Sequence, residues 1–135
     1  TKQQLFKLVI FKIKIEQKIR RVVSKIKKDK NVIAIMLFGS YARNKEYARD
    51  IDICVFLDSS SDNKKMSKKR LKYLNYAPDK FDIQIFQQLP LYIRFNILKE
   101  GKIIHSKKSN FYDIAYDTIK EFSLFEHRYK DYIKL

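Results

Sequence analysis

Two closely spaced aspartates are the first residues of this sequence whose types and spacing could support metal chemistry. Asp50 and Asp52 are separated by Ile51, and Ile53 follows them. On a strand, residues two apart point to the same side, so both carboxylates would share one face while the isoleucines face a core. Like charges this close repel unless a cation lies between them, and oxygen ligands of this kind suit Mg²⁺. Two solvated acids at the start of a strand would give the same pattern.

A third carboxylate, Asp82, occurs early in the segment 81–86, in which apolar residues alternate with Asp82 and Gln84. This alternation predicts a strand with one buried face. If that strand lies beside the strand carrying Asp50 and Asp52, three carboxylates meet on one face of a sheet. Such a group can hold two metal ions and clamp the attacking and leaving oxygens of a phosphoryl displacement.

Gly39 and Ser40 follow the continuous apolar run Val32–Phe38. Glycine lets the backbone approach a ligand closely. Ser40 adds a hydroxyl and, if a short helix begins at Tyr41, the amides of that helix would face a phosphate. Turns use the Gly-Ser pair often, so the pair alone does not indicate a nucleotide site.

The elements that must position these residues can be read from apolar periodicity. The N-terminal third predicts a helix, although Phe11, Ile13 and Ile15 also alternate as a strand would. Its apolar residues at helical spacing are Ile15, Ile19, Val22, Val23 and Ile26, with Leu5, Leu8 and Phe11 as an extension. Strands are expected at 32–38, 51–57 and 81–86, with an edge strand at 102–105. The segment 58–78 has only a weak helical face, and a short helix is expected from Pro90 through Leu98.

The last element has the clearest helical pattern, from a cap at Asn110 to about residue 134. We therefore expect an α+β fold, a mixed sheet of about four strands covered by helices, with a long C-terminal helix. At 135 residues, the sequence supports one domain, 1–135, with a motif core of about 32–86.

Net charge and cysteine content limit the kinds of partner and the cellular compartment that the protein could have. The formal net charge of +15 favours anionic partners. A lysine-rich solvated surface explains that charge equally well. Cys54 is the sole cysteine, which excludes an intramolecular disulfide, and no apolar run is long enough to span a membrane. We expect a reduced, cytoplasmic protein.

Taken together, these motifs closely resemble the minimal nucleotidyltransferase (MNT) proteins of the DNA polymerase β superfamily. The resemblance is carried by Phe38-Gly39-Ser40-Tyr41-Ala42-Arg43, then Asp50-Ile51-Asp52-Ile53, then the isolated Asp82. It covers about residues 32–85 and implies the polymerase β-like nucleotidyltransferase fold. The combined pattern is specific, whereas each motif by itself is not.

The resemblance also implies roles for these residues. Gly39 and Ser40 would bind the triphosphate of ATP, and Asp50 and Asp52 would coordinate Mg²⁺, with two ions expected. Asp82 would complete the metal site and help to deprotonate the acceptor hydroxyl.

Arg43 suits a phosphate, since its fork matches phosphate oxygens. A surface ion pair with Glu46 or Asp50 is equally consistent with its position. The chain departs from the family at Asn44, where Gly is usual, and at Arg49, where Ser is common.

The function implied by the resemblance is transfer of AMP from ATP to a protein partner. MNT proteins typically pair with HEPN-domain proteins as the antitoxins of toxin–antitoxin systems. Two other functions stay open: a non-catalytic binding module that uses the aromatic last helix, and a nucleic-acid-binding protein that relies on its charge. We interpret the basic segment Lys64–Lys72 as a solvated helix face, and homo-oligomerisation stays open.

Overall fold

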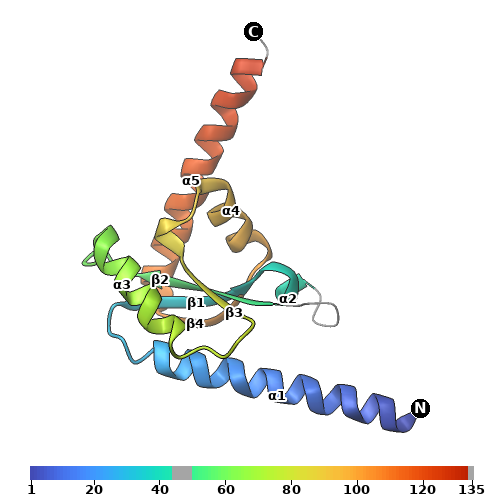
Figure 1. Ribbon diagram of the computed structural model, residues 1–135. Coiled ribbons are helices and arrows are strands. Elements are labelled where there is room, and N and C mark those ends of the chain that lie inside the picture. Colours follow the sequence, from blue (N-terminus) through green and yellow to red (C-terminus); the bar gives the residue numbers. More distant parts are fainter. Residues whose placement is uncertain (44–49, 134–135) are drawn as a thin grey trace.

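The computed structural model describes residues 1–43 and 50–133 as one layered arrangement of helices around a sheet (Figure 1). Its elements in chain order are α1 (Lys2–Ile26), β1 (Val32–Phe38), α2 (Gly39–Arg43), β2 (Ile51–Leu57), α3 (Asn63–Leu74), β3 (Phe81–Ile85), the 3₁₀ turn η1 (Phe86–Gln88), α4 (Leu91–Glu100), β4 (Lys102–Ser106) and α5 (Lys108–Ile133).

The sheet has four strands in the order β3-β2-β1-β4. β1 is antiparallel to both β2 and β4, whereas β2 and β3 are parallel, so the sheet is mixed. The expected fold class, including the edge position of β4, is therefore confirmed. Most importantly for the site, β3 is the direct neighbour of β2, as the sequence argument required.

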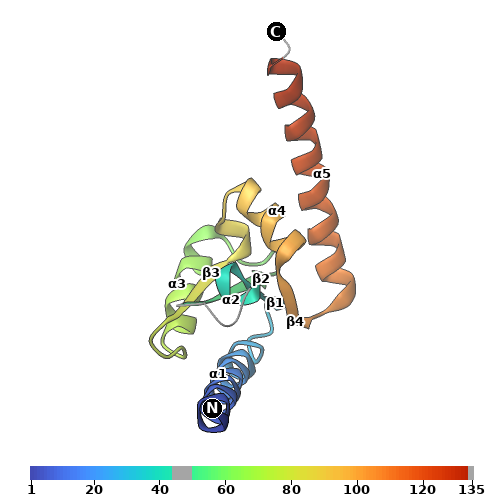
Figure 2. The same ribbon diagram turned by 90° about the vertical axis from the view of Figure 1, so that its right-hand side faces the viewer.

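Helices cover both faces of this sheet, which explains why β1 and β2 are continuous apolar runs. On one face, α1 and α3 pack over a cluster that includes Ile35, Ile53 and Ile83. On the other face, α4 and α5 pack over a cluster that includes Met36, Phe56 and Phe86. Figures 1 and 2 show α4 and α5 together on the side of the sheet away from α1.

α1 is helical over its whole length, so the strand alternative at residues 11–15 was wrong. The side chain of Thr1 caps its first turn and Gln4 completes a capping box. Its buried residues, Ile19, Val22, Val23 and Ile26, all lie in the C-terminal part. The N-terminal half projects away from the sheet (Figure 1) and leaves Leu5 and Phe6 exposed.

α5 begins two residues earlier than expected, so Asn110 is not its cap. The carbonyl of Lys107 accepts from the amide of Phe111 and closes the first turn. Only Phe111 and Thr118 are buried along the helix, while Phe122 stacks on Phe95 of α4 with ring centroids 3.9 Å apart. The spacing of apolar residues predicted the helix correctly, but it did not show that most of those apolar residues are exposed to solvent.

The remaining boundaries differ slightly from the expected ones. β3 ends at Ile85, because Phe86 already begins the 3₁₀ turn. α3 is a well-formed helix capped by Asp62, whose side chain accepts from the amide of Lys65 at 2.8 Å. Among the described helices, none is both long enough and apolar enough to cross a membrane.

Candidate active site

The two aspartates Asp52 and Asp82 lie side by side on neighbouring parallel strands. Asp52 of β2 is the register partner of Asp82 of β3. Register partners project from the same face of a sheet, so their carboxylates share one surface. Ile51 and Ile53 alternate with Asp52 and are buried beneath the opposite face. The structure thus brings these two expected site residues together.

Gly39 lies on the other side of Asp52. Phe38, the last residue of β1, pairs with Asp52, so the next residue turns the chain directly beside this aspartate. Gly39 has a φ of +72°, in the left-handed region. A Cβ on Gly39 would overlap Oδ2 of Asp52 and come within 3.1 Å of its Cγ. Glycine is therefore favoured here by the backbone conformation, and a Cβ would also force the carboxylate of Asp52 to move.

Ser40 is exposed in the first turn of α2, immediately after this glycine. α2 begins at Gly39 rather than at Tyr41, and the buried Tyr41 and Ala42 fix it against the core. Ser40 is thus held at the same end of the sheet as Asp52, where the sequence placed a phosphate contact.

The pKa of Asp52 is raised above its usual value. Burial is the largest cause, and the nearby charges of Asp82 and Asp50 raise the pKa further, while Arg43 lowers it. Asp50 itself is exposed and directly precedes β2. The carboxylates thus repel one another at Asp52, which is the charge imbalance that a bound cation would relieve.

Asp82 is held by two neighbours. Nη2 of Arg70 lies 3.5 Å from its Oδ1, and Nε2 of Gln84 donates to its Oδ2 at 3.0 Å. Arg70 also donates from Nε to the carbonyl of Ile83 at 2.7 Å. The interpretation of the basic segment as a solvated face was therefore wrong at Arg70, because this side chain crosses from α3 to the strand that carries the carboxylate.

Arg43 is exposed, and its Nη1 lies 3.6 Å from Oε2 of Glu100 at the end of α4. This ion pair replaces the one with Asp50 that the sequence suggested. The other expected partner, Glu46, and the two departures from the family pattern, Asn44 and Arg49, lie outside the described residues.

The fit to Mg²⁺ follows from the donor set. Within the described part of the chain, no three Asp, Glu, His or Cys side chains are already gathered closely enough to hold a metal ion. Asp52 and Asp82 nevertheless supply the one or two carboxylates that Mg²⁺ takes from a protein when substrate phosphates complete its shell. Burial and, to a lesser degree, the charges of Asp82 and Asp50 raise the pKa of Asp52, and a cation bound beside it would favour its ionised form. The residues present therefore suit a divalent cation bound together with a nucleotide.

Comparison with known proteins agrees with this geometry. The profile of the family described as "Polymerase beta, Nucleotidyltransferase" matches residues 17–110. "Putative protein adenylyltransferase MJ1547" of Methanocaldococcus jannaschii is 43% identical over 76 residues, which cover 54% of this chain and 55% of that protein. The chain thus spans about half the length of this curated relative.

Two solved structures share the fold at lower identity. A chain of a toxin–antitoxin crystal structure with AMP-PNP aligns with a TM-score of 0.66 and 20% identity, covering 88% of this chain and 95% of that one. A chain of a complex of tri-AMPylated Shewanella oneidensis HEPN toxin with MNT antitoxin aligns with a TM-score of 0.61 and 20% identity, covering 88% and 92%. Because the family profile matches more than half of the sequence and includes Gly39, Asp52 and Asp82, the chain belongs to the polymerase beta nucleotidyltransferase family.

Proposed function

We propose that this protein is a Mg²⁺-dependent nucleotidyltransferase that transfers AMP from ATP to a hydroxyl of a protein partner. The observation that carries the proposal is the register pairing of Asp52 with Asp82, next to the glycine whose missing Cβ makes room for Asp52. Family membership supplies the reaction class, and the site supplies the residues for it.

In the proposed reaction the acceptor oxygen attacks the α-phosphorus of ATP, and the bond from that phosphorus to the pyrophosphate oxygen breaks. Asp50, Asp52 and Asp82 would hold Mg²⁺, which when bound neutralises charge on the phosphates and lowers the pKa of an oxygen that it contacts. Asp82 helps to accept the proton of the acceptor hydroxyl. Gly39 and Ser40 bind the triphosphate, and Arg43, although paired with Glu100, can offer its guanidinium to phosphate oxygens.

A protein acceptor is supported by what the similar proteins are. The curated relative carries the name of a protein adenylyltransferase, and one structural neighbour contains a tri-AMPylated HEPN toxin with its MNT antitoxin. By extension, we assign this chain a HEPN-domain partner and the role of antitoxin. The exposed apolar residues of α5, which include Phe125, Tyr129 and Tyr132, offer a surface for such a partner.

The same surface favours a second candidate function, in which the chain acts by complex formation without catalysis. The two candidates separate at the aspartates. Catalysis requires them, whereas docking through α5 does not.

The test is an assay of AMP transfer. The protein, ATP and Mg²⁺ are mixed with a HEPN-domain protein, and the partner is analysed by mass spectrometry for added AMP. We expect transfer with wild type, and none with Asp52→Asn, with Asp82→Asn or after chelation of the metal. Lys64→Gln, an exposed change on α3 away from both the aspartates and the docking face of α5, serves as the control and should retain transfer. A partner that binds equally to wild type and Asp52→Asn, and gains AMP from neither, would establish the binding module instead.

A further inference from the structure

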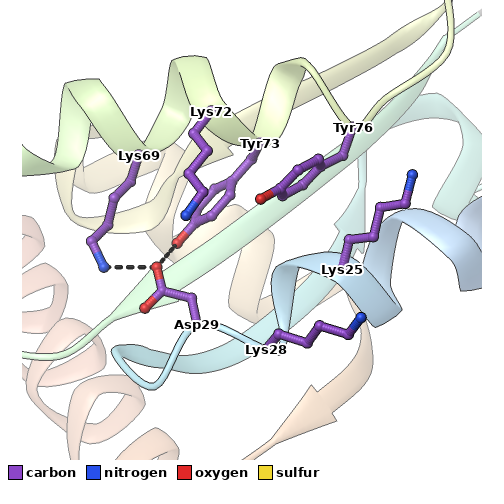
Figure 3. A pocket seen from close by; sticks show the side chains of 7 residues that line it. All are labelled: Lys25, Lys28, Asp29, Lys69, Lys72, Tyr73 and Tyr76. Atoms are coloured by element: carbon purple, nitrogen blue, oxygen red, sulfur yellow. Dashed lines mark hydrogen bonds and ion pairs between the residues drawn. The ribbon is translucent and has the colours of Figure 1, made fainter.

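A polar pocket lies between the end of α1 and the helix α3, away from the aspartates. It has a volume of about 480 Å³, within the range of small-molecule sites. It is lined by Lys25, Lys28, Asp29, Lys69, Lys72, Tyr73 and Tyr76. Figure 3 shows Lys69, Lys72 and Tyr73 on α3 and Tyr76 on the turn that follows it, with Lys25 and Lys28 across from them. The lining holds four lysines and one aspartate, a net charge of +3.

The single acid of this pocket is already committed. Oδ2 of Asp29 accepts from Nζ of Lys69 at 2.7 Å and from the hydroxyl of Tyr73 at 2.5 Å, both drawn in Figure 3. Its other oxygen accepts from the amide of Asn31 at 3.0 Å. Asp29 therefore neutralises Lys69. Because Asp29 is the one acid among the residues that line the pocket, no lining carboxylate is left to pair with the other three lysines.

No acid of the described residues forms an ion pair with the remaining three ammonium groups. Lys28 and Lys72 are exposed and form no ion pair with any described carboxylate, and Lys25 lies over the ring of Tyr76 at 5.8 Å from its centroid. Like charges that gather around one hollow repel, and an anion in the hollow removes that repulsion. Ammonium groups bind phosphate well because each is a compact charge with several donors.

The pocket is separate from the candidate active site. It adjoins the turn before β1, where Val32 pairs with Leu57, whereas the aspartates lie where Phe38 pairs with Asp52. At the rise of a strand, these two ends of β1 are roughly 20 Å apart. One phosphate chain bound at the aspartates does not fill this pocket.

We propose that the pocket between α1 and α3 is a second anion site that binds a small oligophosphate, such as a diphosphate or triphosphate group, through Lys25, Lys28 and Lys72. A small anion is favoured over a nucleic-acid backbone because the lysines border one hollow of limited volume, open to solvent on one side, rather than a continuous groove. The phosphate chain can be free or part of a nucleotide, in which case the ring of Tyr76 borders the base.

The experiment measures binding of tripolyphosphate to the full chain by isothermal titration calorimetry, with EDTA present so that no metal-dependent site contributes. We expect saturable binding that weakens at least about tenfold in Lys28→Gln/Lys72→Gln. The matched control is Lys64→Gln/Lys68→Gln, which removes the same charge from exposed positions of α3 outside the pocket. That control should change the affinity by less than about threefold. Lys28→Arg/Lys72→Arg retains the charges and should restore binding.

Two comparisons distinguish the source of the phosphates. ATP that binds as tightly as tripolyphosphate indicates recognition of the phosphate chain alone, whereas tighter binding of ATP that is lost in Tyr76→Leu indicates a nucleotide. Equal weakening by the pocket and control pairs overturns the proposal. Tripolyphosphate binding that appears only when Mg²⁺ replaces EDTA and that is lost in Asp52→Asn also overturns it. A third contrary result is a short single-stranded RNA that binds through the same lysines while tripolyphosphate does not bind.

Discussion

The carboxylate of Asp52 occupies the space that a side chain on Gly39 would fill. The two residues come from different elements, since Gly39 directly follows β1 and begins α2, whereas Asp52 lies near the start of β2. A Cβ at residue 39 would collide with Oδ2 of Asp52, and the backbone there has a φ of +72°. The glycine of the Gly-Ser motif thus makes room for the acid of the Asp-x-Asp motif.

Gly39→Ala should therefore destabilise the protein for two separable reasons. The left-handed backbone costs about 1 kcal/mol with any ordinary side chain. Displacing the carboxylate of Asp52 adds to this, for a total of about 1–3 kcal/mol in the free energy of unfolding. Urea denaturation of wild type and variant measures the loss.

A double-mutant cycle separates the two causes. In an Asp52→Ala background the colliding oxygen is absent, and the nearest remaining atom of residue 52, its Cβ, would be at 3.5 Å. There Gly39→Ala should cost only the backbone part, about 1 kcal/mol. An equal cost in both backgrounds would show that the contact with Asp52 is energetically irrelevant.

Asp52→Asn should stabilise the protein near neutral pH in the absence of metal. The pKa of Asp52 is raised by burial and by its acidic neighbours, so the folded state holds its proton more tightly than the unfolded state. Stability therefore falls as pH rises from the ordinary value of 3.8 through the raised pKa, and the penalty is complete above it. Because Asp52 is only partly buried, removing the charge should add about 1 kcal/mol or less at pH 7.

Thermal unfolding at pH 7 and pH 3.5 tests the sign of this effect. The gain in Tm should be present at pH 7 and much smaller at pH 3.5, where Asp52 is mostly protonated in both states. Asp113→Asn, an exposed change on α5, should have no comparable effect at either pH. A gain of equal size at both pH values would mean that the charge of Asp52 is not its cause.

The sequence could predict the faces of the strands that carry the site, but not which strands are neighbours. The alternation around Asp52 and Asp82 assigned each acid to the face opposite the buried isoleucines, and burial of Ile53 and Ile83 agrees. Periodicity carries no information on strand order, so the pairing of β2 with β3 rested on an assumption. The family resemblance supported that assumption, and the register of Asp52 with Asp82 confirms it.

The roles of Lys69 and Arg70 could not be predicted from the sequence. They are adjacent in a run of basic residues, yet Lys69 pairs with Asp29 and Arg70 with Asp82. What orients them is the burial of Tyr73, which fixes the rotation of α3 about its axis. The helix has few apolar residues, so its buried face is set by tertiary contacts rather than by its own pattern. Similarly, the apolar spacing of α5 predicts a helix without showing which part of it the sheet covers.

Asp29→Ala should destabilise the protein by about 2 kcal/mol at pH 7. It leaves the buried Tyr73 hydroxyl without its acceptor and removes the charged partner of Lys69, whose ammonium keeps only Oδ1 of Asn31. Burial alone opposes ionisation of Asp29, but the hydrogen bonds from Lys69, Tyr73 and Asn31 outweigh it and lower the pKa. The ionised carboxylate therefore contributes stability that is present above the unfolded value near 3.8 and is lost as pH falls through the lower folded pKa.

Urea denaturation at pH 7 and pH 3 measures this contribution. The difference between wild type and Asp29→Ala should be smaller at pH 3 than at pH 7. Asp117→Ala, which removes an exposed acid from α5, should change the free energy of unfolding by less than about 0.5 kcal/mol. A difference that grows on acidification would contradict the role assigned to the ionised carboxylate.

Arg70→Gln should strengthen the binding of Mg²⁺ at the aspartates while weakening the fold. The guanidinium of Arg70 lies 3.5 Å from Oδ1 of Asp82 and thus competes with a cation for that oxygen. Its removal should tighten Mg²⁺ binding about threefold, a modest effect because Arg70 is one-third exposed. Loss of the hydrogen bond to the Ile83 carbonyl should cost about 1 kcal/mol of stability. Arg70→Lys keeps the charge but not the two-pronged guanidinium, so it should show the loss of stability without the tighter binding of Mg²⁺.

Titrations of Mg²⁺ followed by the shift in Tm compare the two variants. An Arg70→Gln variant that binds Mg²⁺ more weakly than wild type would show that Arg70 positions Asp82 for the metal instead of competing with it.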